Sequence, residues 1–317
     1  MVYFLVSVLG QDKVNLLAML LAAALTALMT GVFRGRLPQD HGRAFAVNGA
    51  LSRGKARGAG LIFTLCIVLV VLAFVPFTPE MLIYMALLTA SMLSGYFDDA
   101  SDKPWNEYKK GLIDFVIAAA AGCTFVRFDS TEIHFFGLTA QLPPVLYVVL
   151  AIVLIWASIN VTNCSDGVDG LCATLCLVVI GTFLLGFGAQ LGEFATAALV
   201  VAGALLAYLW ENVSPSSLLM GDAGSRALGF FLALLAMKSH HPFAFLAAAL
   251  VLILDGGLGI LKISLKRFLH IWILKNTLTP LHDEARKKRG WSDAQVVYRF
   301  ALMQVVAAAA LLLAIHS

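Results

Sequence analysis

Two adjacent carboxylates, Asp98 and Asp99, directly follow an apolar stretch in the segment "YFDDASDKPWNEYKKG", which covers residues 96–111. Like charges side by side repel each other, and both are costly to desolvate near lipid. We therefore expect a cation or a water-filled site to receive them. Lys109 and Lys110, at the end of the same segment, are candidates for binding phosphate oxygens there.

Two further acidic motifs could share this chemistry: "NVTNCSDGVDG", with Asp166 and Asp169, and "LLMGDAGS", with Asp222. Each motif alone could also be a turn or a helix N-cap. Together with the basic residues they indicate magnesium and phosphate chemistry, because Mg²⁺ usually binds one or two carboxylates plus substrate phosphates. The sequence contains no P-loop and no dinucleotide-binding fingerprint, so ATP hydrolysis is not expected.

The elements that must position these residues belong to a membrane protein. The 317 residues are 60% hydrophobic and 13% charged, with a mean hydropathy of +0.88. Soluble domains carry about 25% charged residues. We therefore predict an all-α integral membrane protein, built as a single polytopic domain over residues 1–317. The net charge of +3 gives no reason to expect a nucleic-acid partner.

A helix needs about 20 apolar residues to cross a bilayer. Ten candidate spans fall near 14–33, 59–77, 79–97, 111–126, 144–161, 171–189, 194–211, 222–238, 242–261 and 296–315. Between the fourth and fifth spans, "RFDSTEIHFFGLTAQLPP" alternates polar and apolar residues, which predicts a small hairpin outside the membrane. Ser292 and Gln295 have the spacing of a capping box at the start of the last span.

The distribution of Lys and Arg predicts the orientation. With ten spans, one side of the membrane carries the segments 34–58, 98–110, 162–170, 212–221 and 262–295. These segments and the adjoining span ends hold all of the 22 Lys and Arg residues except Lys13, Arg127 and Lys238. The positive-inside rule makes this side cytoplasmic and places both termini outside. The three acidic motifs lie on the same side, although they were not used to derive it.

Several of these segments resemble one known family. The resemblance rests on "LPQDHGRAFAVNGALSRGKARGAG", "GYFDDASDKPWNEYKKGL", "NCSDGVDGL", "ENVSPSSLLMGDAGSRALG" and "TPLHDEARKKRGWSDAQVVYRF". They are similar to motifs of the polyprenyl-phosphate N-acetylhexosamine-1-phosphate transferase superfamily and, within it, of the phospho-N-acetylmuramoyl-pentapeptide transferases. Two of the family's motifs read N-x-T-D-G-x-D-G-L and F-N-x-x-P-A-x-x-F-M-G-D-x-G-S-L-x-L-G. The resemblance covers roughly residue 34 to the end.

The resemblance implies a ten-helix enzyme of the bacterial inner membrane, with a Mg²⁺-dependent site on the cytoplasmic face. Undecaprenyl phosphate would attack the β-phosphate of UDP-MurNAc-pentapeptide, which gives lipid I and UMP. This step of peptidoglycan biosynthesis supports cell wall formation, cell shape and cell division. The resemblance also implies inhibition by nucleoside natural products, and it is compatible with a homodimer.

The resemblance assigns roles to individual residues. Asp98 and Asp99 match the paired aspartates, with Asp98 the candidate base for the lipid phosphate. Asp222 matches the aspartate of the M-G-D motif, a magnesium ligand, and His282 matches a histidine of the last loop, also among the catalytic candidates. The candidates for substrate binding are Lys110, Asn163, Asp166, Asp169, Asn212 and Leu219.

Two departures from the family pattern matter for the site. The family's last loop carries three consecutive histidines, whereas this chain reads His282-Asp283-Glu284 and is two residues longer before Gly290. Leu219 stands where an aromatic residue is expected to stack on uracil, so weaker stacking is expected. Asp255, inside the ninth span, is unusual because intramembrane acids are functional by default. It lies away from the other motifs, and a helix break or a catalytic role are both open.

Two alternatives stand beside this interpretation. A sister transferase would use UDP-GlcNAc for teichoic acid or O-antigen synthesis, but the segment "TPLHDEARKKRGW" fits the muramoyl-pentapeptide branch better. A cation-coupled transporter would place its charges near the midplane and often shows inverted repeats. Here the acidic motifs cluster at one face and no repeat is found, so the transporter is the weakest alternative.

Overall fold

The computed structural model describes residues 2–40, 42, 52–101, 103, 105–135 and 137–316. Part of the predicted first cytoplasmic loop, including Arg43, lies outside the described residues, as do Asp102 and Phe136 of two further predicted loops.

Long helices form at nine of the ten predicted spans. They are α2 Gln11–Phe33, α3 Ala59–Phe74, α4 Pro79–Asp99, α5 Glu107–Phe128, α6 Pro144–Ser165, α7 Leu171–Leu191, α8 Glu193–Asn212, α9 Gly221–Lys238 and α14 Asp293–His316. Seven helices of the described chain are long and apolar enough to cross a membrane, namely all of these except α3 and α9. The shorter α3 is still apolar, and α9 carries Asp222, Arg226 and Lys238. The chain is therefore an all-α, multi-pass membrane protein, and the total of ten spans stays a prediction.

The ninth predicted span is not one continuous helix. It is divided into α10 Ala244–Ala248, α11 Leu250–Leu252, the π-helical turn η2 Ile253–Gly257 and α12 Leu258–Phe268. At the break, the Gln304 side chain from α14 accepts a hydrogen bond from the backbone N–H of Val251 at 2.7 Å. Backbone groups freed inside a membrane must find such partners. π-helical turns inside α-helices occur often at functional sites.

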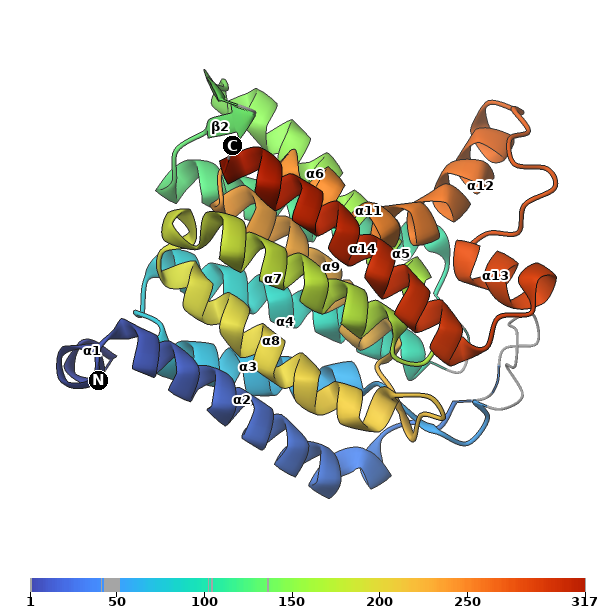
Figure 1. Ribbon diagram of the computed structural model, residues 1–317, viewed down its shortest axis with the longest axis horizontal. Helices are drawn as coiled ribbons and strands as arrows, with labels where there is room; N and C mark the ends of the chain where they lie inside the picture. Colours follow the sequence, from blue (N-terminus) through green and yellow to red (C-terminus); the bar gives the residue numbers. More distant parts are fainter. Residues whose placement is uncertain are drawn as a thin grey trace.

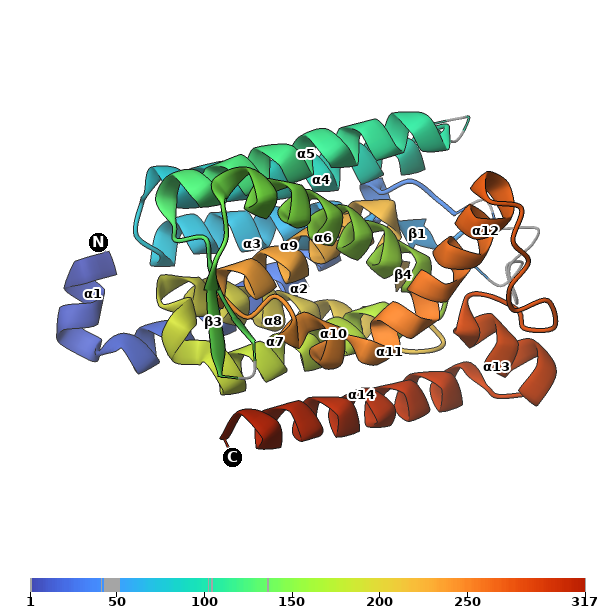
Figure 2. The same cartoon turned by 90° about the horizontal axis from the view of Figure 1, so that it is seen from above.

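Helix α9 lies inside the bundle, and every residue from Gly221 to Met237 is buried. It packs against α3, α4, α6 and α7 (Figure 2). Glycines permit the closest of these approaches, as is common between membrane helices. A Cβ atom on Gly95 of α4 would lie 2.3 Å from the carbonyl carbon of Asp222, and one on Gly60 of α3 would lie 1.9 Å from the backbone nitrogen of Gly224.

The two ends of the bundle carry different structures. At one end, β2 Glu132–Phe135 and β3 Leu138–Gln141 form the predicted antiparallel hairpin. The short α1 Val2–Leu9 and both termini lie at this hairpin end (Figures 1 and 2). The opposite end carries the 3₁₀ turn η1 Arg34–Arg36, the strands β1 Ala56–Arg57 and β4 Leu218–Leu219, and the helix α13 Leu281–Arg289. Both termini therefore share one end of the bundle, and the expectation that this end faces outside stays a prediction.

Candidate active site

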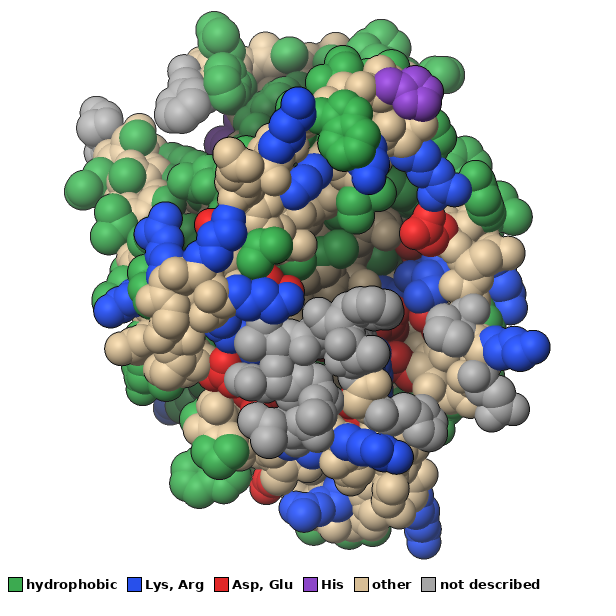
Figure 3. Space-filling view, turned by 90° about the vertical axis from the view of Figure 1, so that its right-hand side faces the viewer, with side chains coloured by type: hydrophobic (Ala, Val, Ile, Leu, Met, Phe, Trp, Pro, Cys, Tyr) green, Lys and Arg blue, Asp and Glu red, His purple; other side chains and the backbone are tan. Residues whose placement is uncertain are grey.

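The strands β1 and β4 form a small parallel sheet at the end of the bundle opposite the hairpin. Ala56 pairs with Leu218, and Arg57 pairs with Leu219. This sheet joins the loop after α2 to the loop that precedes α9, and it places Arg57 beside the acidic motifs. On this face, Lys and Arg side chains surround a hollow, with acidic side chains at its edges (Figure 3).

Arg57 binds three carboxylates from separate parts of the chain. Its Nε donates to Asp99 at 2.9 Å, Nη1 donates to Asp40 at 3.0 Å, and Nη2 donates to Asp222 at 3.2 Å. Burial opposes the charged guanidinium, but Asp99, Asp222 and Asp40 outweigh it and raise the pKa of Arg57. Burial alone would raise the pKa of Asp40, yet hydrogen bonds from Ser52 and Arg57 lower it.

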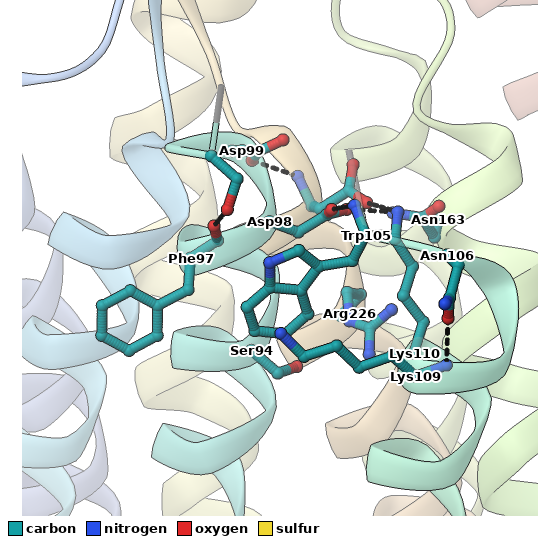
Figure 4. Close-up of polar contacts among 12 residues, drawn as sticks. Ser94, Phe97, Asp98, Asp99, Trp105, Asn106, Lys109, Lys110, Asn163 and Arg226 are labelled. Carbon is teal, nitrogen blue, oxygen red and sulfur yellow. Dashed lines mark hydrogen bonds and ion pairs between the residues drawn. The ribbon is translucent and has the colours of Figure 1, made fainter. Parts of the chain in front are cut away.

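The paired aspartates have different partners (Figure 4). Asp98 forms an ion pair with Lys110, and its Oδ1 accepts a hydrogen bond from the backbone N–H of Trp105 at 2.7 Å. Asp99 forms an ion pair with Arg57, and its Oδ2 accepts from the backbone N–H of Asp222 at 2.7 Å. Each carboxylate therefore has its own cation, which offsets the repulsion between the two neighbours.

Lys110 connects the paired aspartates with the M-G-D motif. Its Nζ lies 3.6 Å from Oδ2 of Asp222 while it contacts Asp98. The side chain of Asn106 caps the first turn of α5 by accepting from the N–H of Lys109 at 2.7 Å, which fixes where this turn begins. Asp98, Asp99, Lys110 and Asp222 thus meet from α4, α5 and α9.

The donor atoms of this cluster fit a hard divalent cation. Asp98, Asp99 and Asp222 supply carboxylate oxygens, and Mg²⁺ needs only one or two of these when phosphates and waters complete its shell. Within the described residues, no group of three or more His, Cys, Asp or Glu side chains is arranged to bind a metal by itself.

The other predicted polar residues lie in the neighbouring loops. Oδ2 of Asp169 accepts from the backbone N–H of Ser216 at 2.9 Å and from Nζ of Lys55 at 3.4 Å. Asn212 is buried, and its side chain accepts from the N–H of Gly170 at 2.8 Å and donates to the carbonyl of Leu218 at 2.8 Å. Asn212 therefore connects the Asp169 loop to β4.

Three more predicted residues are Asn163 on α6, Asp166 directly after α6, and Leu219 on β4. Nδ2 of Asn163 donates to Oγ of Ser225 at 3.0 Å, one turn along α9 from Asp222. Asp166 directly follows α6, where its N–H donates to the carbonyl of Asn163 at 3.3 Å. Leu219 is partly buried in β4, next to the strand that carries Arg57.

His282 binds the intramembrane acid Asp255. Oδ1 of Asp255 accepts from the backbone N–H of His282 at 2.8 Å, and its Oδ2 lies 2.9 Å from Nδ1 of the imidazole. The other edge of the ring faces Gly167, where a Cβ atom would lie 2.2 Å from Nε2 of His282. The expectation that Asp255 lies away from the other motifs is wrong, because the π-helical turn directs it to the last loop.

The two residues that replace the family's histidines stabilise the last loop. Asp283 accepts from Arg286 at 3.1 Å, and Arg286 also donates to the carbonyl of Gly167 at 3.2 Å. Glu284 accepts from the backbone N–H of Leu278 at 2.6 Å. The departures from the family pattern thus provide contacts within the loop and, through Arg286, to the Asp166 loop.

Sequence reasoning missed Asp40 and Arg57 as members of the site. From the sequence alone, Arg57 contributes only to the charge bias, and no role is predicted for Asp40. The available signal was their position in "LPQDHGRAFAVNGALSRGKARGAG", the loop that resembles a family motif. Nothing in the sequence states that Asp40 and Arg57 lie beside the paired aspartates.

Comparisons with known proteins agree with these motifs. Residues 81–240 match the family model described as glycosyl transferase family 4. The phospho-N-acetylmuramoyl-pentapeptide-transferase of Treponema pallidum, in strain Nichols and in one further strain, is 40% identical over 290 residues, which cover 84% of this chain and 80% of the relative. The protein of the same name from Rhodopseudomonas palustris strain BisA53 is 27% identical over 314 residues, which cover 87% of this chain and 85% of the relative.

Proposed function

Because the chain belongs to the phospho-N-acetylmuramoyl-pentapeptide transferase family, we propose that it transfers phospho-MurNAc-pentapeptide from UDP-MurNAc-pentapeptide to undecaprenyl phosphate. The products are lipid I and UMP, and the reaction is a membrane step of peptidoglycan synthesis. The observation that carries the proposal is the meeting of Asp98, Asp99, Lys110 and Asp222 at one end of the bundle. The Lys and Arg bias supports a cytoplasmic location for this end.

In the proposed reaction, an oxygen of the lipid phosphate attacks the β-phosphorus of the nucleotide sugar. A new P–O bond forms, and the bond to the bridging oxygen breaks, so that UMP leaves with the electron pair. Asp98 takes the proton when the lipid phosphate is still protonated. Lys110, between Asp98 and Asp222, can donate to a phosphate oxygen, and Arg57 can do the same on the other side of Asp222.

We propose Mg²⁺ as the divalent cation, with Asp222 as its protein ligand. Such an ion would neutralise the charge of the diphosphate. Asp99 acts differently, since it accepts the backbone N–H of Asp222 and so orients the first turn of α9.

The nucleotide and sugar would bind beside Asn163, Asp166, Asp169 and Asn212. Of these, Asn212 is buried and acts by holding the Asp169 loop beside β4. Leu219 offers an aliphatic surface to the uracil ring, which gives a weaker contact than an aromatic stack.

The experiment measures transfer of radiolabel from a UDP-sugar into butanol-soluble lipid, with the purified protein, undecaprenyl phosphate and Mg²⁺. We expect lipid labelling from UDP-MurNAc-pentapeptide. Labelling from UDP-GlcNAc alone would instead identify the sister transferase. No labelling from either donor would refute the proposed function.

The metal assignment makes a separate prediction. Asp222→Asn should abolish turnover while the protein stays folded, because the amide replaces a charged ligand with a neutral one. Raising the Mg²⁺ concentration should rescue little activity. The measurements are a Mg²⁺ titration of the transfer rate and thermal unfolding of both proteins. Wild-type turnover in excess chelator would contradict the metal role.

A further inference from the structure

A second charged pair lies directly beneath the site and has no role in the mechanism above. Nη2 of Arg226 donates to Oδ1 of Asp114 at 2.5 Å, and the side chains are only 4% and 0% exposed. Asn160 of α6 adds a contact of 3.4 Å to Oδ2 of Asp114. Figure 4 labels Arg226 among the residues drawn around the site. The resembled motif G-S-L-x-L-G has leucine where this chain has Arg226.

The spacing couples this pair to the site. Lys110 and Asp114 are four residues apart on α5, so they share one face of that helix, and so do Asp222 and Arg226 on α9. Both helices begin at the site. Two ion pairs therefore join α5 and α9. In the first, Lys110 of α5 lies 3.6 Å from Asp222 of α9; in the second, one turn deeper, the signs are exchanged and the carboxylate of Asp114 on α5 binds Arg226 of α9.

A contribution to folding stability does not by itself explain why Asp114 and Arg226 form a buried ion pair. Removing two charges from water offsets most of the attraction between them, so an apolar replacement is often equally stable. The guanidinium is also incompletely satisfied, because Nε of Arg226 is buried without a hydrogen-bond partner among the described residues. A buried pair can, however, fix the register of two elements.

We propose that Asp114 and Arg226 are positioning residues: their ion pair fixes α5 against α9 at the site and so holds Lys110 beside Asp222 and Asp98. The proposal rests on the proposed function. It assigns neither residue a contact with substrate. It states that Lys110 contributes much less to the transfer rate once the ion pair between Asp114 and Arg226 is removed.

A double-mutant cycle with Lys110→Gln measures this dependence. In the wild-type background, Lys110→Gln should lower kcat by about a hundredfold, the usual loss for one electrostatic donor. In the apolar background Asp114→Leu/Arg226→Leu, which removes both charges, the same substitution should cost about tenfold or less, because interacting residues are not additive. Equal losses in the two backgrounds would overturn the proposal.

A matched control exists at the other end of the same helices. Lys238 ends α9 and binds Asp129, the residue after α5, at 2.6 Å. Lys238→Met removes this ion pair, together with the one from Lys238 to Glu80 of α4, far from the site. It should lower the melting temperature, while Lys110→Gln should cost the same as in the wild type. A reduced cost in this background would show a general loss of packing and would also overturn the proposal.

Two further measurements keep the test decisive. If the apolar variant does not accumulate, Arg226→Lys, which keeps the charge, should retain near-wild-type kcat, whereas Arg226→Gln should lose it; equal rates would refute the pair's role. The melting temperatures of Lys110→Gln, Asp222→Asn and their double variant give a cycle that needs no turnover. The changes in melting temperature should be non-additive in the wild-type background and additive in the background without the Asp114–Arg226 pair. Because this cycle needs no turnover, failure of the proposed function and failure of this inference are distinguishable.

Discussion

Asp98 and Asp99 are neighbours in sequence, yet each has its own environment at the end of α4. Asp98 contacts Lys110 and the N–H of Trp105, near the proposed position of the reacting phosphates. Asp99 contacts Arg57 and the N–H of Asp222, and its carboxylate is only 3% exposed. At the residue scale, Asp98 is therefore the better candidate for a proton acceptor, and Asp99 for an orienting group.

The two substitutions should differ in their pH dependence. Asp98→Asn should recover part of its lost rate as pH rises, because the second pKa of a phosphate is near 6 and the acceptor then ionises without a base. Asp99→Asn should stay slow at every pH, because its orienting contacts are lost. The measurement is kcat against pH at saturating Mg²⁺ and substrates. Parallel profiles of the two variants would contradict separate roles.

A second prediction concerns the ring of His282. Gly167→Ala places a Cβ atom 2.2 Å from Nε2 of His282, and Asp255 prevents the ring from moving away. We expect a loss of transfer rate of about tenfold or more and a lower melting temperature, since overpacking costs about 1–3 kcal/mol. Gly181→Ala is the control, because its Cβ atom meets nothing within 4 Å. Equal activity in both variants would show that the position of His282 is unimportant.

At the scale of elements, the site depends on how closely α4 approaches α9. Gly95 lies one turn before Asp98 and Asp99, and its missing side chain lets α4 touch the backbone of Asp222. The same contact brings the carboxylate of Asp99 within 2.7 Å of the N–H of Asp222. The contact between Gly95 and the backbone of Asp222 therefore affects both the packing of α4 on α9 and the geometry of the site.

Gly95→Ala should consequently impair stability and activity together. The added methyl group would lie 2.3 Å from backbone atoms of Asp222, which cannot rotate away, so α4 must shift. We expect a loss of about 1–3 kcal/mol in unfolding free energy and at least a tenfold lower transfer rate. Gly31→Ala, with nothing within 4 Å of its Cβ atom, is the control. A fully active Gly95→Ala enzyme would refute the importance of this approach.

At the scale of the whole molecule, the two ends of the bundle differ in charge and structure. The end with β1, β4 and α13 carries the acidic cluster inside a basic surface (Figure 3). The hairpin end carries a smaller network in which Lys238 contacts Asp129 and Glu80. We infer from the charge bias that the first end faces the cytoplasm.

Cysteine labelling tests this orientation in a background without the five native cysteines. An impermeant thiol reagent added to intact cells should leave cysteines at positions 103 and 287 unlabelled. It should label Leu138→Cys, because this hairpin residue is 70% exposed at the other end of the bundle. Labelling of position 103 or 287 from outside would reverse the orientation.

The sequence determined nine long helices, because the length of an apolar stretch and the thickness of a bilayer are local quantities. It also determined the hairpin, and the capping box in which Ser292 and Gln295 exchange hydrogen bonds of 3.1 and 3.2 Å. The paired aspartates, Lys110 and Asp222 could be identified because short motifs carry them. The assignment of their roles stays a proposal.

Only the tertiary structure decided which cation serves which carboxylate. Arg57 is 165 residues from Asp222, and Arg226 is 112 residues from Asp114. Asp255 reaches His282 through a π-helical turn that replaces part of the expected straight span. Such contacts depend on glycine-permitted approaches between helices and on side-chain reach. Neither is encoded in local apolar periodicity, because each requires two distant segments to meet in space.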